Sequence, residues 1–176
     1  MALHALKNCR YTVGNGAQVL AMPYKDKEYE FVVFLPLESV KFEEFRSNLT
    51  GDAMKELLSQ ATNETNGVNI RMPKFKVTSQ PPMKQMLQQL GISHLFCDGC
   101  DLKGVCENED LFVDDVIHKA VVEVSEEGTK AAAATAVLFC RGRRPMVAVA
   151  PTFRADHPFV YGIFLSGEPL FIGQYC

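Results

Sequence analysis

A short stretch near the N-terminus imposes antiparallel β-structure on this chain. Three segments rich in β-branched and aromatic side chains, which favour strands, lie close together: residues 11–13, 17–24 and 29–35. A Gly-Asn-Gly turn at residues 14–16 separates the first two, and a polar turn at residues 25–27 separates the last two. Glycine and asparagine accept the backbone angles of tight hairpin turns. Because connections this short join antiparallel neighbours, the sequence predicts a three-stranded meander.

Apolar side chains at helical spacing predict short helices between the strands. The helices are expected at residues 41–49, 52–61 and 83–90. Thr50 or Asp52 is expected to cap the second helix, because both side chains accept hydrogen bonds from free N–H groups. Pro81 and Pro82 lead into the third helix, and Gly91 ends it.

The second half of the chain adds further strands. Residues 68–77 alternate apolar and polar side chains up to Pro73, and residues 113–124 are expected to form one long strand after a loop at residues 93–110. A short strand is expected at residues 146–150. Two apolar segments after it are expected to form a buried closing hairpin. These segments are residues 159–165 and 170–172, joined at residues 166–168. Strands outnumber helices and are segregated from them, so the predicted class is α+β.

Length, charge and cysteine content narrow the function. The chain has 176 residues, enough for one domain with its own core. A net charge of −3 and the lack of an 18-residue apolar run argue against nucleic-acid or membrane partners. Of six cysteines, Cys97, Cys100 and Cys106 form a C-x2-C-x5-C pattern without a further pair or histidine at zinc-finger spacing. We therefore expect free thiols, no metal and no cofactor.

Residues 126–145 (EEGTKAAAATAVLFCRGRRP) are expected to form an exposed functional loop. The four alanines at 131–134 suit a helix or a linker, but so long a connection within a compact domain itself points to function. Written as a strand, the segment has one face made of small, uncharged side chains: Thr129, Ala131, Ala133 and Thr135. Lys130 falls on the opposite face, and Gly128 supplies a hinge before it. Such a strand is suited to insertion between two others.

The distal half of this loop is a cluster of arginines. It contains Arg141, Gly142, Arg143 and Arg144, followed by Pro145. Four interpretations remain open for the cluster: a solvated charge patch, a nuclear-localisation signal, a processing site of the R-x-R-R kind, and bait for a trypsin-like protease. The last rests on the acidic pocket by which such proteases select arginine or lysine.

Several segments, taken together, resemble the serpin family of protease inhibitors. In chain order they are residues 68–75 (VNIRMPKF), 91–92 (GI), 101–105 (DLKGV), 118–121 (HKAV), 126–136 (EEGTKAAAATA) and 153–159 (FRADHPF). The resemblance implies a partial serpin fold of antiparallel sheets with a few short helices. It also implies a single partial domain over residues 1–176, corresponding to the C-terminal half of a serpin, with the reactive-centre loop at about residues 126–145.

The resemblance implies a serine-type endopeptidase inhibitor rather than an enzyme. A trypsin-like serine protease would attack the loop, form an acyl-enzyme and be trapped when the hinge inserts into a sheet of a metastable fold. The hinge would comprise Glu126, Glu127, Gly128, Thr129, Ala131, Ala132, Ala133, Ala134 and Thr135. Lys130 replaces the acidic residue usual in the family. His118 would help to hold the sheet closed.

The resemblance leaves the cleaved bond open. Family spacing points near Gly142, which offers a specificity pocket no side chain, and Pro145 hinders cleavage after Arg144. The bonds Arg143–Arg144 and Arg141–Gly142 are therefore favoured, the first of them because the loop is slightly long.

A typical serpin is roughly twice as long, so a second hypothesis stands beside inhibition. It is a truncated, non-inhibitory fragment that acts as a substrate or binds a partner by strand addition. Unpaired strand edges would then favour self-association. Family resemblance predicts an extracellular protein, whereas the lack of a signal peptide in this chain predicts a cytoplasmic one.

Overall fold

The computed structural model describes residues 5–107, 111–125 and 150–176. They fall into two compact units, each described on its own below. The first unit combines Met1–Pro73 with Ser125–Cys176, and the second is Lys74–Val124. Within the described ranges, none of the helices combines the length and the apolar character needed to cross a bilayer.

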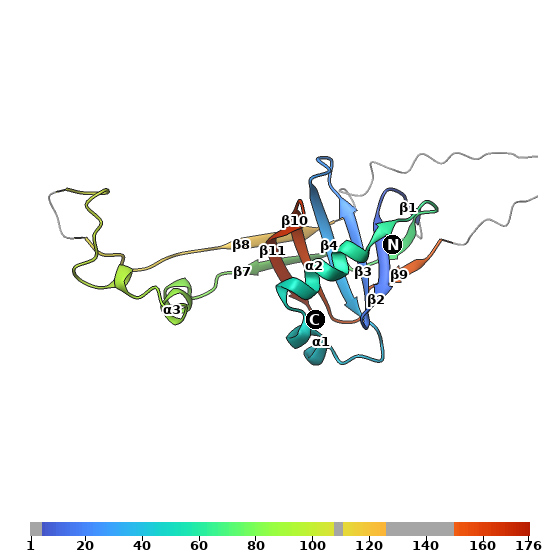
Figure 1. The fold of residues 1–176 in the computed structure, drawn as a ribbon, viewed down its shortest axis with the longest axis horizontal. Coiled ribbons are helices and arrows are strands. Elements are labelled where there is room, and N and C mark those ends of the chain that lie inside the picture. The colour runs from blue at the N-terminus through green and yellow to red at the C-terminus, as the bar shows by residue number, and fades with distance from the viewer. Residues whose placement is uncertain (1–4, 108–110, 126–149) are drawn as a thin grey trace, which may run out of the picture. The chain divides into compact units, whose positions relative to one another are not determined.

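A six-stranded antiparallel sheet forms the centre of the first unit (Figure 1). Its strand order is β11-β10-β4-β3-β2-β5. The predicted meander is confirmed in β2 (Arg10–Gly14), β3 (Ala17–Pro23) and β4 (Tyr29–Pro36), which pair as consecutive antiparallel neighbours. Asn15 and Gly16 adopt φ angles of 49° and 76° in the first turn, the left-handed region that their small or polar side chains tolerate.

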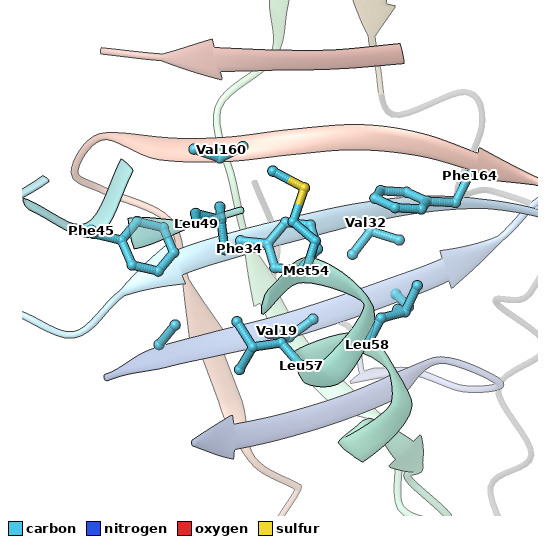
Figure 2. Packing of buried hydrophobic residues seen from close by; sticks show 12 residues of the cluster. Val19, Val32, Phe34, Phe45, Leu49, Met54, Leu57, Leu58, Val160 and Phe164 are labelled. Atoms are coloured by element: carbon cyan, nitrogen blue, oxygen red, sulfur yellow. The ribbon is translucent and has the colours of Figure 1, made fainter. Parts of the chain in front are cut away.

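Two helices cover one face of this sheet. They are α1 (Phe42–Asn48) and α2 (Gly51–Gln60), both close to the predicted bounds. Figure 2 shows Phe45, Leu49 and Leu57 directed at Val19 and Phe34 of the sheet, all within one buried cluster. The predicted cap of α2 is Thr50, whose side-chain oxygen accepts a hydrogen bond from the N–H of Ala53.

The predicted closing hairpin is confirmed in its strand pairing, but the prediction that both of its strands are buried was wrong. Strands β10 (Phe159–Leu165) and β11 (Glu168–Tyr175) pair as antiparallel neighbours around the predicted turn. β10 lies inside the sheet and is mostly buried, whereas most of β11 is exposed. The reason is position: β11 is the last strand in the order, so among the described residues only β10 flanks it.

A second, smaller sheet of the first unit combines part of the strand predicted at residues 68–77 with two short strands that the sequence patterns did not reveal. Its order is β1 (Ala5–Leu6), β6 (Val68–Arg71) and β9 (Thr152–Arg154). Phe153 of β9 is fully buried, and its ring meets that of Tyr11 in β2 edge to face, with 6.4 Å between centroids. Another short strand, β5 (Thr62–Asn63), pairs with the start of β2.

The second unit contains a two-stranded antiparallel sheet of β7 (Phe75–Ser79) and β8 (Ala120–Val124), together with α3 (Met83–Gln89) and a 3₁₀ turn η1 (His94–Phe96). Lys84 of α3 donates to the carbonyl of Asp114 at 2.7 Å, and its ammonium group lies 5.6 Å from the centre of the Phe96 ring. These contacts tie the helix to the following loop.

Two strand predictions in this region were too long. The strand expected at residues 68–77 is two strands, β6 and β7, divided at residues 72–74 where Pro73 cannot donate a ladder hydrogen bond. The strand expected at residues 113–124 begins only at Ala120, which pairs with Ser79 at the end of β7. Beyond Ser79 the chain turns through two prolines, so residues 113–119 have no ladder partner there. Of the strand predicted at residues 146–150, all but Ala150 lies outside the described residues.

Candidate functional site

The predicted functional loop lies between two described segments, and its own residues fall outside the described ranges. These are the hinge residues 126–135 and the arginine cluster 140–145. The structure therefore describes the segments that flank the loop on either side, and each segment is considered within its own unit.

The segment that leads into the loop is β8. It runs antiparallel to β7, with Ala120 opposite Ser79 and Val124 opposite Phe75. An ion pair between Lys76 and Glu123, 2.9 Å apart, links the exposed face of the two strands. Among the described residues β8 pairs on one edge only, so its other edge has free backbone donors and acceptors.

His118, predicted to help close a sheet, lies two residues before β8 and is exposed. Its predicted role remains a prediction.

The segment that follows the loop is anchored by hydrogen bonds to β6. The backbone N–H of Asn69 donates to the carbonyl of Pro151 at 2.8 Å, and its side-chain amide donates to the carbonyl of Ala150 at 3.3 Å. Strands β6 and β9 then run parallel, and the N–H of Ala155 donates to the carbonyl of Arg71 at 2.8 Å. The chain from Ala150 onward is therefore held by residues about eighty positions earlier in the sequence.

A polar cluster just beyond β9 completes this anchor. The Nε2–H of His157 donates to the carbonyl of Pro36 at the end of β4, at 2.7 Å, while Nδ1 lies 3.2 Å from a carboxylate oxygen of Asp156. The guanidinium of Arg154 contacts the same carboxylate at 2.5 Å. The hydrogen bond with His157, and then the charge of Arg154, lower the pKa of Asp156. Residues 153–159 are recognisable as a motif in the sequence, but the contact of His157 with Pro36 is visible only in the structure.

The described cysteines are free thiols. Cys97 donates to the carbonyls of Ser93 and His94, and Cys100 donates to the carbonyl of Leu111 at 3.0 Å. Over the described ranges, no three His, Cys, Asp or Glu side chains gather closely enough to hold a metal ion. Cys9 is buried, and burial raises the pKa of its thiol, which makes it a poor nucleophile.

Two cavities border helix α1. One, of about 310 Å³, lies between the helices and β11, where Leu49, Met54 and Ile172 contribute to its lining. The other, of about 200 Å³, is lined by Phe45 and Leu57 among others. Neither cavity contains the clustered titratable groups that acid–base chemistry needs.

Comparison with known proteins gives one family match and several relatives. The family model described as Serpin (serine protease inhibitor) matches residues 1–176. Iripin-3 of Ixodes ricinus is 39% identical over 161 residues, which are 90% of this chain and 40% of that protein. Leukocyte elastase inhibitor A of Rattus norvegicus is 35% identical over 170 residues, covering 90% of this chain and 43% of that protein.

Solved structures give the same result for the fold. The native thermophilic serpin tengpin superimposes with a TM-score of 0.69 at 28% identity, covering 94% of this chain and 43% of that one. A serpin from the trematode Schistosoma haematobium gives a TM-score of 0.74 at 23% identity, covering 95% of this chain and 44% of its own. The chain thus spans about two fifths of the length of the curated relatives it matches.

Proposed function

The chain belongs to the serpin family, and we propose that it forms the C-terminal half of a serine protease inhibitor and presents the reactive-centre loop at residues 126–145. Its two compact units would then both belong to one serpin domain. The curated relatives named as elastase inhibitors support an inhibitory rather than a catalytic role.

One observation carries the proposal: a hinge-like sequence closely follows β8, a strand whose second edge has no partner among the described residues. Thr129, Ala131, Ala133 and Thr135 give the predicted hinge one small face, and the segment begins five residues after β8 ends at Val124. Small side chains can enter a sheet without displacing their neighbours. An edge that offers free N–H and C=O groups is where an added strand forms its hydrogen bonds.

Trapping proceeds through an acyl-enzyme. The serine oxygen of the protease attacks the carbonyl carbon of the reactive-centre residue, and the peptide nitrogen leaves with a proton from the catalytic histidine. The new N-terminal end of the cleaved chain stays anchored through the bonds of Asn69 and His157. The hinge side, freed from that anchor, inserts into the sheet and carries the acylated protease with it, and the relaxation of the fold drives the step.

The arginine cluster supports a trypsin-like protease as the target. A trypsin-like pocket pairs an arginine side chain with a buried carboxylate, and the favoured reactive bonds are Arg143–Arg144 and Arg141–Gly142. Elastases instead accept small side chains, and the names of several relatives make them the competing target.

The proposal is tested by incubating the chain separately with trypsin and with leukocyte elastase and running each mixture on a denaturing gel. We expect a band with trypsin that survives denaturation and is larger than either protein. Arg143→Ala should reduce this band by at least about tenfold, because the pocket loses its charged partner. Arg141→Ala tests the other favoured bond: loss of the band in this variant, with Arg143→Ala unaffected, would move the reactive bond to Arg141–Gly142.

A second candidate function is a non-inhibitory fragment that proteases cleave as a substrate. The observation that favours it is the coverage of about two fifths of the relatives' length. In the same experiment this candidate gives cleaved chain, free protease and no larger band.

A further inference from the structure

Three cysteines gather in the loop that follows α3 and η1 in the second unit (Figure 1). Cys97 is exposed, whereas Cys100 and Cys106 are half-buried. None of these thiols belongs to the predicted reactive-centre loop or to the bonds that anchor the chain after it. Within the described ranges they gather no further ligands of the kind that a metal ion needs, so the chemistry left to them is that of thiols and disulfides.

A tight turn brings the first two of these cysteines together. Asp98 and Gly99 form the turn, and Gly99 adopts a φ angle of 86°, as the third residue of a type II turn does. A turn of this kind keeps its first and last Cα atoms within about 7 Å of each other. Disulfides join residues whose Cα atoms are about 4.4–6.8 Å apart. Cys97 and Cys100 are the first and last residues of the turn, so the backbone holds them at the separation that a disulfide requires.

In the reduced protein the two thiols contact different acceptors. Cys97 donates to the carbonyls of Ser93 and His94 at 3.4 and 3.5 Å. Cys100 donates to the carbonyl of Leu111 at 3.0 Å. Thiols are weak donors, so these bonds oppose disulfide formation only slightly, and rotation about each Cα–Cβ bond redirects the sulfur. Oxidation removes both S–H protons and therefore replaces the link from Cys100 to Leu111 by a bond within the turn.

We propose that Cys97 and Cys100 form a redox-active dithiol, which a low-molecular-weight disulfide such as glutathione disulfide oxidises to an intramolecular disulfide. The thiolate of Cys97, the more exposed of the two, attacks one sulfur of glutathione disulfide, forms a mixed disulfide and releases one glutathione thiolate. The thiolate of Cys100 then attacks the Cys97 sulfur, and the second glutathione thiolate leaves. The two cysteine protons end on the two glutathione molecules, so two thiols are oxidised while one disulfide is reduced.

The third cysteine of the loop lies in a separate turn. The backbone N–H of Cys106 donates to the carbonyl of Leu102 at 3.2 Å. Because Cys106 comes six residues after Cys100, a four-residue turn cannot join the two. We therefore expect Cys106 to stay a thiol under conditions that oxidise the pair, and it serves as an internal reference.

The test equilibrates the full 176-residue chain with glutathione buffers of increasing disulfide content, quenches the exchange with acid and alkylates the remaining thiols. After denaturation, a lysine-specific protease releases residues 85–103, which contain Cys97 and Cys100, and residues 104–119, which contain Cys106. Mass spectrometry then separates the pairings. A disulfide within the turn leaves the first peptide unalkylated and lighter by two hydrogen atoms, whereas a bond between the turn and Cys106 joins the two peptides.

Two glycine variants test the role of the turn. Gly99→Val opposes the positive φ angle, which a β-branched residue strongly disfavours, so the turn should open and separate the two cysteines. Gly104→Val is the matched control, because Gly104 lies in the same loop with a φ angle outside the left-handed region. An added Cβ meets no atom within 4 Å at either position, so the two variants differ in backbone strain rather than in packing.

The expected result is a disulfide in residues 85–103 that forms as the glutathione disulfide content rises, while Cys106 remains alkylated. Its equilibrium constant against glutathione should fall about tenfold in Gly99→Val and stay unchanged in Gly104→Val. Full alkylation of residues 85–103 in every buffer overturns the proposal, as does a bond to Cys106 in place of the one within the turn. Equal oxidation of the unmodified chain and Gly99→Val also overturns it, because the turn would then not pair the cysteines.

Discussion

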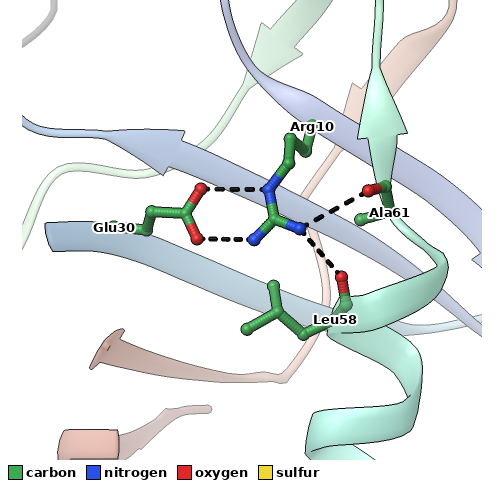
Figure 3. Close-up of polar contacts among 4 residues, drawn as sticks. All are labelled: Arg10, Glu30, Leu58 and Ala61. Carbon is green, nitrogen blue, oxygen red and sulfur yellow. Dashed lines mark hydrogen bonds and ion pairs between the residues drawn. The ribbon is translucent and has the colours of Figure 1, made fainter. Parts of the chain in front are cut away.

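Arg10 and Glu30 form a two-point ion pair between strands β2 and β4, across the intervening β3. Nε of Arg10 lies 3.1 Å from one carboxylate oxygen, and Nη2 lies 2.5 Å from the other. Nη1 donates to the carbonyl oxygens of Leu58 and Ala61 at the end of α2 (Figure 3). One side chain thus joins the sheet to the helix that covers it.

Removing this contact should destabilise the first unit. Arg10 and Glu30 side chains are only 29% and 16% exposed, so the pair is partly shielded from water. Arg10→Met leaves the carboxylate and two helix carbonyls without their donor, and we expect a loss of about 1–3 kcal/mol in the free energy of unfolding. Urea titration followed by circular dichroism measures it.

The matched control is Lys55→Met, which breaks a more exposed pair with Glu168, whose side chains are 49% and 69% exposed, and should leave the urea midpoint unchanged. Equal losses in the two variants would contradict the account of Arg10.

The cap at the start of α2 should be measurable in the same assay. Thr50→Ala removes the acceptor for the N–H of Ala53, and we expect the free energy of unfolding to fall by about 1 kcal/mol. Ser47→Ala is the control, since that hydroxyl donates to the carbonyl of Glu43 within α1 and caps nothing. A cap mutant as stable as the Ser47 variant would show that Thr50 does not fix the helix start.

Gly162 should not tolerate a methyl group. A Cβ there would lie 2.7 Å from both the Phe164 ring and the backbone oxygen of Phe171, and Phe164 is buried. Gly162→Ala is expected to cost about 1–3 kcal/mol through overpacking and to lower the melting temperature. Gly51→Ala meets no atom within 4 Å in the first turn of α2, so it should leave the melting temperature equal or higher. A reversed order of the two variants would refute this packing.

Stability should depend on Asp156 at acid pH. His157 and Arg154 lower the pKa of Asp156 in the folded protein, whereas the unfolded value is about 3.9. The carboxylate therefore contributes stability fully above the unfolded pKa, and the contribution is lost as the pH falls through the lower, folded value. The difference in urea midpoint between the unmodified chain and Asp156→Asn should be present at neutral pH and vanish at strongly acid pH. A difference that is constant with pH would exclude this linkage.

The sequence predicted those elements whose signals are local. The meander, α2 and the cap at Thr50 follow from side-chain alternation, helical spacing and turn residues within a few positions of one another. Strand β9 could not be predicted, because its three residues become a strand only through parallel pairing with β6, about eighty residues earlier.

Two errors have the same physical origin. The strand expected from residue 113 was too long because alternation says nothing about where the partner strand ends, and β7 ends at Ser79. The burial expected for β11 was wrong because apolar composition does not reveal what covers a strand. For the site, the loop stays a prediction from the sequence, which also identified the motif that follows it, but the bond from His157 to Pro36 spans 121 positions and required the structure.

The most direct test of the central claim, that the loop traps a trypsin-like protease, is the intact mass of the product formed with trypsin under denaturing conditions. The account predicts an adduct whose mass equals trypsin plus residues 1–143 less one water, joined by an ester to the protease serine, together with released residues 144–176. Unmodified trypsin beside two pieces of cleaved chain would contradict it.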